Sequence, residues 1–219
     1  MAAQLKLVLV DLDGTLIKGT SAEKTFLWFL IRRHYIRGLN VLRFILRMFW
    51  LIPTRGWHHA KGENKAYLQG VPLEQLQQWI REYTETVLPS LLSPTLCRRI
   101  LELKERGCTV VLLSGSLQLL VEQVQSSLQV DAAFGVPLRI QNGKASGSID
   151  GLFPFGKDKV KVLLQQFDSD QVDWRASWAF ADRYQDLPVF NLVGHPVVVN
   201  PKKKLFTCAR KHGWEILNT

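Results

Sequence analysis

The sequence has little cysteine, little methionine and no long uncharged apolar run. Its three cysteines, Cys97, Cys108 and Cys208, are far apart and form no Cys-x-x-Cys pair, so we expect neither a disulfide framework nor a zinc site. No stretch reaches the roughly 18 uncharged apolar residues that a membrane-spanning helix needs. The first residues lack the basic, apolar and cleavable regions of a signal peptide, so we expect a cytoplasmic protein.

Acidic residues are also in the minority. There are 19 of them against 28 lysines and arginines, which gives a formal net charge of +9. An excess of this size indicates an anionic partner, either a phosphorylated small molecule, an acidic membrane surface or nucleic acid. We expect no nucleic-acid partner, because the charges are spread out and no recognition motif is present.

Short apolar runs rich in β-branched residues alternate with amphipathic stretches along most of the chain. We predict buried strands at 5–10, 109–113, 178–181 and 197–199. Helical periodicity separates most of them, at 96–106, 117–128, 160–167 and 187–193. This alternation predicts an α/β fold with a three-layer, Rossmann-like core, in which helices cover both faces of a parallel sheet.

Residues 17–88 differ from the rest of the chain, because they have helical periodicity and no convincing strand. We predict that they form an inserted helical cap, and that 1–16 and 89–219 together form the catalytic core. Residues 135–155 contain Asn142-Gly143 and further glycines, which predict a hairpin.

One cap helix allows two interpretations. From Leu39 to Ile52 nearly every face is apolar, apart from a stripe of Asn40, Arg43 and Arg47 at helical spacing. The helix is either cap core or a dimer surface, or it is an interfacial helix whose arginines meet anionic headgroups at the inner face of a membrane. The oligomeric state is equally open.

Carboxylates and hydroxyls follow the predicted strands, where ligands bind in parallel sheets. The segments are Asp11-Leu12-Asp13-Gly14-Thr15, Ser114-Gly115-Ser116, and Asp182 with Asp186 four residues later. Crowded carboxylates repel unless a cation lies between them, and an oxygen-only shell selects a hard ion such as Mg²⁺. In this arrangement Asp11 could attack phosphorus, and Asp13 could protonate the leaving oxygen and then activate water. Ser114, which we expect to open a helix, could hold a phosphoryl oxygen.

With Lys159 at the head of a helix, these motifs stand in the order typical of the haloacid dehalogenase superfamily. The chain resembles subfamily IB, the branch that includes phosphoserine phosphatase. The resemblance implies an Mg²⁺-dependent phosphatase that forms an aspartyl-phosphate. It assigns the nucleophile to Asp11, the acid/base and a metal-binding carbonyl to Asp13, further metal binding to Asp182, its support to Asp186, and phosphate binding to Ser114, Gly115 and Lys159. Lys157 and Lys161 are close to Lys159 but lack its spacing to the apolar residues that follow.

Three positions depart from that pattern. Ala181 and Arg183 flank Asp182, where the family usually has glycine and a small residue, so Arg183 could weaken the magnesium site. Thr20 stands where phosphoserine phosphatases have a glutamate that binds the substrate amine, which counts against phosphoserine. The cap opening is similar to that of bacterial phosphatidylglycerophosphate phosphatases, so a lipid phosphate is an alternative to a phosphorylated small molecule. There are two alternative functions. One is a phosphotransferase of the same fold, and the other is a binding or scaffold protein with weakened catalysis.

Overall fold

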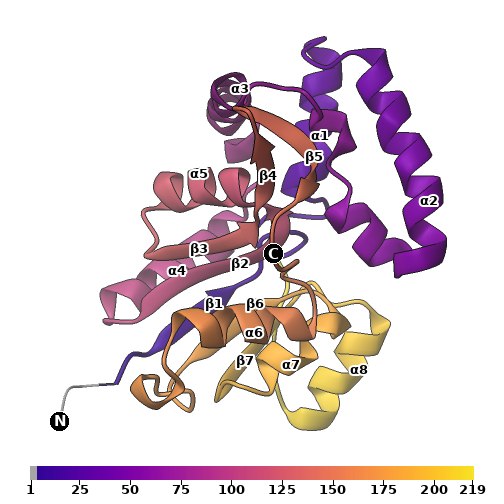
Figure 1. Ribbon diagram of the computed structural model, residues 1–219. Coiled ribbons are helices and arrows are strands. Elements are labelled where there is room, and N and C mark those ends of the chain that lie inside the picture. The colour runs from indigo at the N-terminus through magenta and orange to yellow at the C-terminus, as the bar shows by residue number, and fades with distance from the viewer. Residues whose placement is uncertain (1–3) are drawn as a thin grey trace.

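A six-stranded parallel sheet forms the centre of the computed structural model, which describes residues 4–219 (Figure 1). The strand order is β3-β2-β1-β6-β7-β8, and all five neighbouring pairs are parallel. The strands span Leu7–Val10 (β1), Thr109–Leu117 (β2), Ala132–Val136 (β3), Trp178–Ala181 (β6), His195–Val199 (β7) and Glu215–Leu217 (β8). The predicted α/β fold with a parallel sheet is confirmed.

Each face of the sheet has its own apolar layer, because successive side chains of a strand point to opposite sides. Val8 and Val10 of β1 pack into a cluster with α4 (Pro94–Glu105) and α5 (Gln118–Leu128). Leu7 and Leu9 pack into the other cluster, with α6 (Lys157–Gln166), α7 (Leu187–Phe190) and α8 (Lys203–His212). Helices on both faces make the three layers that the alternating pattern predicts.

A helical cap lies beyond the carboxyl ends of β1 and β2 (Figure 1). It contains α1 (Ala22–Arg32), α2 (Gly38–Glu63), η1 (Ala66–Leu68), α3 (Leu73–Thr86) and η2 (Leu88–Ser90). Gly56 interrupts α2 with a φ of 74°, which kinks the helix three residues after Pro53. Two further 3-10 turns, η3 (Ser169–Gln171) and η4 (Tyr184–Asp186), belong to the core.

The predicted hairpin is present as β4 (Leu138–Gln141) and β5 (Lys144–Ile149), joined at Asn142 and Gly143. Both turn residues have a positive φ, 50° and 71°, as this type of hairpin turn requires. The hairpin packs on the cap, since Gly147 O accepts the backbone N–H of Lys65 and Ala145 O accepts that of Gly70. It extends the cap with a segment that lies far away in the sequence. The division at 17–88 remains a prediction.

The predicted strands and helices fall within or overlap the observed ones. Trp178–Ala181 matches its prediction, while β2 extends four residues further than the predicted 109–113. The short strands β3 and β8 and helix α8 were not predicted. Among residues 4–219, no helix combines the length and apolarity needed to cross a membrane.

Candidate active site

Asp11 stands directly after β1 and is almost buried, with 8% of its surface exposed. Its backbone N–H donates to Phe180 O at 2.9 Å, so the neighbouring strand β6 holds it in place. The Thr15 hydroxyl donates to Asp11 Oδ2 at 3.2 Å, and Lys159 Nζ lies 2.5 Å from Asp11 Oδ1. The carboxylate is therefore fixed from both sides at the end of the central strand.

Lys159, in the first turn of α6, connects two of the predicted acidic residues. Its Nζ lies 2.5 Å from Asp11 Oδ1 and 2.8 Å from Asp186 Oδ1. Burial alone would lower the pKa of Lys159, but the Asp11 and Asp186 carboxylates outweigh it and raise that pKa, so the ammonium stays charged. Lys157 is exposed and Lys161 pairs with Asp158. Of these three lysines, Lys159 is the one that reaches the site.

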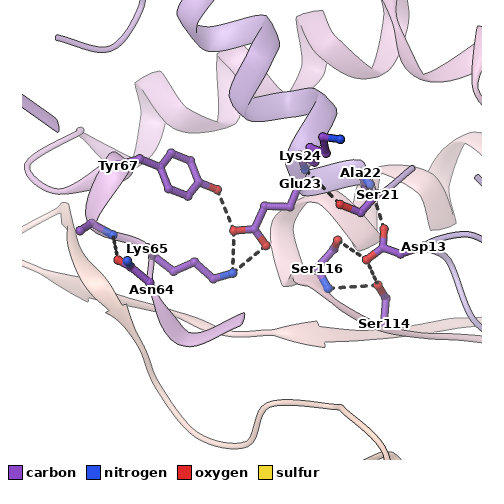
Figure 2. A network of polar contacts seen from close by, with 11 residues as sticks. Asp13, Ser21, Ala22, Glu23, Lys24, Asn64, Lys65, Tyr67, Ser114 and Ser116 are labelled. Atoms are coloured by element: carbon purple, nitrogen blue, oxygen red, sulfur yellow. Dashed lines mark hydrogen bonds and ion pairs between the residues drawn. The ribbon is translucent and has the colours of Figure 1, made fainter. Parts of the chain in front are cut away.

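Asp13 is held by neutral donors (Figure 2). Ala22 N–H, at the start of α1, donates to Oδ1 at 2.8 Å, and the Ser116 hydroxyl donates to Oδ2 at 2.7 Å. Burial raises the pKa of Asp13, and the nearby Asp11 charge raises it further, against the opposing effect of these hydrogen bonds. Asp13 therefore favours the protonated form more than an ordinary carboxyl does.

Ser114 does not open a helix, so that prediction is wrong. Ser114 lies within β2, which continues to Leu117. Leu117 pairs with Val136 of β3 after a register shift. The strand extends because β3 offers a pairing partner beyond the predicted strand end. Ser114 Oγ accepts the Ser116 N–H at 3.0 Å and donates to Asp13 Oδ2 at 3.4 Å. Its hydroxyl still lies beside the site, but no helix N-terminus begins there.

Asp182 completes a cluster of three carboxylates with Asp11 and Asp186. One oxygen from each residue lies within 4.8 Å of the others. Asp182 Oδ1 is buried and has no hydrogen-bond donor among residues 4–219. Burial, and then repulsion from Asp11, raise the pKa of Asp182 to about 7. An all-oxygen set with an unpaired buried atom fits a hard divalent cation.

Two neighbours shape this cluster. Gly14 passes so close to Asp182 that a Cβ there would collide with the Asp182 carboxylate, and its φ of 87° also favours glycine. Arg183 Nε lies 3.6 Å from Asp182 Oδ1, an ion-pair distance that is too long for a hydrogen bond. The arginine thus faces the same oxygen that would bind the cation.

A cavity of about 370 Å³ opens onto Asp11 and Asp13 and continues under the cap. Leu27 of α1 and Phe44 of α2 line one part of it, and Phe153 and Phe155 line another. The two phenylalanine rings lie in the loop before α6 and stack with their ring centroids 5.6 Å apart. Sequence patterns did not indicate that these two phenylalanines line a cavity, because the loop has no periodicity. Charged cap residues also line the cavity: Glu23, Lys24 and Lys61.

Comparison with known proteins places this geometry in a family. A model described as haloacid dehalogenase-like hydrolase matches residues 8–191, most of the chain. The chain belongs to this family of hydrolases. The resemblance drawn from the four motifs is confirmed, and the matched range includes every predicted site residue.

Named relatives cover most of the chain at low identity. The chain is 27% identical over 213 residues to phosphoserine phosphatase SerB1 of Mycobacterium tuberculosis, covering 94% of this chain and 68% of that protein. It is 25% identical over 194 residues to a phosphoserine phosphatase of Methanocaldococcus jannaschii, covering 89% and 85% of the two chains.

Solved structures share the fold of this haloacid dehalogenase-like chain. A Bordetella pertussis protein with unknown function has a TM-score of 0.82 at 19% identity, covering 98% of this chain and 99% of that one. A phospho-aspartyl intermediate analogue of phosphoserine phosphatase has a TM-score of 0.63 at 20% identity, covering 98% and 93%. The second similarity extends over both the core and the cap.

Proposed function

We propose that the protein is a magnesium-dependent phosphatase that hydrolyses a phosphate monoester through an aspartyl-phosphate on Asp11. The observation that carries the proposal is the contrast between two carboxylates at one strand end. Asp11 contacts the Lys159 ammonium, while Asp13 is half-buried among neutral donors and has a raised pKa. Opposite environments of this kind separate a charged nucleophile from a proton-donating acid.

The two half-reactions use these carboxylates in turn. In the first, an Asp11 oxygen attacks phosphorus, the ester P–O bond breaks, and Asp13 gives its proton to the leaving oxygen. In the second, the ionised Asp13 takes a proton from water, which attacks the phosphorus of the aspartyl-phosphate and releases inorganic phosphate. The Ala22 and Ser116 hydrogen bonds keep Asp13 oriented through both steps.

Magnesium would be held by Asp11, Asp182 and the backbone carbonyl of Asp13, with Asp186 in support. Asp182 Oδ1, which accepts no hydrogen bond from residues 4–219, and the clustered oxygens support this assignment. When bound, the ion would neutralise negative charge on the phosphoryl oxygens. Ser114, the backbone at Gly115 and Lys159 are the proposed phosphate-binding groups, and Lys159 would supply a permanent positive charge.

The substrate within this proposal is either a phosphorylated small molecule or a lipid phosphate. The apolar walls formed by Leu27, Phe44 and Phe153 favour an organic group with apolar surface. Thr20 has no carboxylate that could bind the amine of a substrate such as phosphoserine. Glu23 is nearby, but Lys65 and Tyr67 already occupy its oxygens. These features support a substrate other than phosphoserine.

Release of inorganic phosphate from a panel of amino-acid, sugar, nucleotide, choline and lipid phosphates, with and without Mg²⁺, tests the proposal. We expect turnover of at least one compound by the wild type and none by Asp11→Asn, whose amide is nearly isosteric but a poor nucleophile. Asp150→Asn, at an exposed position, is the matched control and should keep full activity. Comparable turnover by Asp11→Asn, checked for deamidation, would contradict the mechanism.

The same assay separates the alternatives. A phosphotransferase would pass the phosphoryl group to an added alcohol faster than to water. Arg183, which faces Asp182, is the observation that favours a binding protein with weakened catalysis. Such a protein would bind phosphate esters without releasing phosphate from any of them.

A further inference from the structure

The outer face of α2 is apolar and exposed. Six large side chains make up this face, which we call the docking face: Leu39, Leu42, Ile45, Leu46, Phe49 and Trp50. Phe49 and Trp50 are 73% and 69% exposed. In Figure 1, α2 lies at the outer edge of the cap, and no other element covers its outer side. So many large apolar side chains on one exposed helix face indicate a binding surface.

This face is separate from the one that packs onto the cap. The inward side of α2 carries Phe44 and Leu51, and Asn40, whose amide donates to Tyr67 O and Gln69 O. With 3.6 residues per turn, positions 42, 45, 46 and 49 fall on the opposite side of the helix, and positions 39 and 50 lie along the flank beside them. The interpretation of α2 as cap core therefore accounts for only one of its two apolar faces.

The positive charge of the protein is concentrated around the same helix. Residues 24–62 contain eight lysines and arginines and no aspartate or glutamate. The other positions contain 20 basic and 19 acidic residues, so this segment supplies eight of the nine net charges. The charges are thus less evenly spread than we expected from the whole chain.

The arginines of the predicted stripe differ in their contacts. Arg47 is turned inward and donates to Gly147 O at 2.6 Å. Arg43 is exposed, has no acidic partner among residues 4–219, and lies one turn from Leu39 and Leu46 on the border of the docking face. Arg32 and Arg37 are exposed nearby and likewise have no acidic partner in the described chain. Arg43, rather than Arg47, is the charge available to a ligand.

We propose that the docking face binds the surface of an anionic lipid bilayer. An apolar helix face bordered by arginines, in a segment without carboxylates, suits the boundary between acyl chains and anionic headgroups. A second copy of the chain fits less well, because a two-fold contact through this face would bring the two basic borders together. The other side of α2 supplies Phe44 to the cavity wall, and α1 supplies Leu27, so a docked protein would hold its cavity close to lipid.

Sedimentation of the full chain with vesicles tests this inference. One vesicle is phosphatidylcholine alone and the other an equimolar mixture of phosphatidylcholine and phosphatidylglycerol. We expect binding to the anionic vesicle only, and weaker binding as salt rises. Each unit charge near such a surface contributes roughly fivefold to partitioning. Arg43→Glu changes the charge by two units, so it should weaken binding about 25-fold. Phe49→Ser/Trp50→Ser should weaken it at least as much, by removing apolar insertion.

Matched substitutions on α8 provide the controls. Phe206→Ser and Arg210→Glu change an exposed apolar residue and an exposed cation outside the docking face, so both should bind as the wild type does. Circular dichroism establishes that each variant is folded. Binding needs no turnover, so Asp11→Asn should sediment normally, and this result stays distinct from the fate of the proposed phosphatase activity.

Two outcomes would overturn the proposal. The first is a wild type that stays in the supernatant with both vesicles; a dimer that Phe49→Ser/Trp50→Ser converts to monomers would then assign the face to a second copy. The second is vesicle binding that the docking-face variants leave unchanged. Either result removes the docking face as a lipid-binding surface.

Discussion

Lys65 places its ammonium nitrogen 2.6 Å from both carboxylate oxygens of Glu23, and the Lys65 side chain is fully buried. Figure 2 shows Glu23 at the start of α1 between Lys65 and Tyr67, whose hydroxyl donates to Glu23 at 2.9 Å. Burial, and then the Glu23 charge, raise the pKa of Tyr67 well above its ordinary value, so the phenol stays neutral. The pair connects α1, whose Ala22 N–H holds Asp13, to the cap segment that follows α2.

Glu23→Gln should destabilise the protein by about 3–5 kcal/mol, because it leaves the Lys65 ammonium buried without a counter-charge. Urea unfolding followed by circular dichroism measures the change. Glu74→Gln is the matched control, since Glu74 also lies in the first turn of a cap helix but is exposed.

The double variant Glu23→Gln/Lys65→Met removes both charges and should recover much of the loss. If Glu23→Gln is no less stable than Glu74→Gln, the ion pair does not hold the cap segment in place.

Asp13→Asn should reduce turnover of an alkyl phosphate by roughly a hundredfold or more, because the leaving oxygen then receives no proton. Nitrophenyl phosphate needs no such help, since nitrophenolate is a good leaving group. With that substrate the variant should release one equivalent of nitrophenol in a burst and then slow down, because water activation also needs Asp13.

Rapid-mixing absorbance measures the burst. Ser148→Ala, which changes a hydroxyl in the cap hairpin, is a control and should behave as the wild type. Equal losses of turnover on both substrates, with no burst, would mean that Asp13 neither protonates the leaving oxygen nor activates the water.

The convergence of Asp11 and Asp182 could be predicted from the sequence, because strand ends in a parallel sheet share one edge. β1 pairs directly with β6, which places Asp11 and Asp182 side by side. Lys159, which the resemblance singled out by the family's spacing to the apolar residues that follow, also reaches Asp11. The convergence of the strand ends is predictable because strand direction determines positions along a regular element.

Irregular segments and two-sided helices were beyond the same reasoning. Ser114 lies within β2 because this strand pairs with β3 again at Leu117, and β3 consists largely of small residues that gave no strand signal. α2 is apolar on two sides, so periodicity alone could not tell that Arg47 faces inward and Arg43 outward. Phe153 reaches the cavity from a loop, where no period applies. In each case tertiary contacts determine where the strand ends or which way the side chain points.

Arg183→Ser should lower the Mg²⁺ concentration that gives half-maximal rate, because Arg183 competes for the Asp182 oxygen from 3.6 Å. We expect a change of about 1.4- to 5-fold, since an ion pair with one exposed partner is worth roughly 0.2–1 kcal/mol. Initial rates over a magnesium titration give the value. Arg175→Ser, at an exposed arginine elsewhere in the core, is the control. An unchanged magnesium requirement would clear Arg183 of this role.

The metal-free protein should become less stable as pH rises from about 4 through about 7. Burial and the Asp11 charge raise the pKa of Asp182 from its ordinary value to about 7. Between those two values the folded protein keeps a proton that the unfolded chain has lost. Because the unfolded state then binds fewer protons, the free energy of unfolding falls with rising pH, and the fall is complete above the folded-state pKa.

Thermal unfolding in excess chelator at a series of pH values measures this effect. Asp182→Asn cannot titrate, so its melting temperature should fall less steeply over the same range, while Asp150→Asn should follow the wild type. Added Mg²⁺ should stabilise the wild type most at the high-pH end, where binding the cation displaces no proton from Asp182. If Asp182→Asn and the wild type lose stability equally as pH rises, then titration of Asp182 does not cause the pH dependence, and its carboxyl is already ionised at low pH.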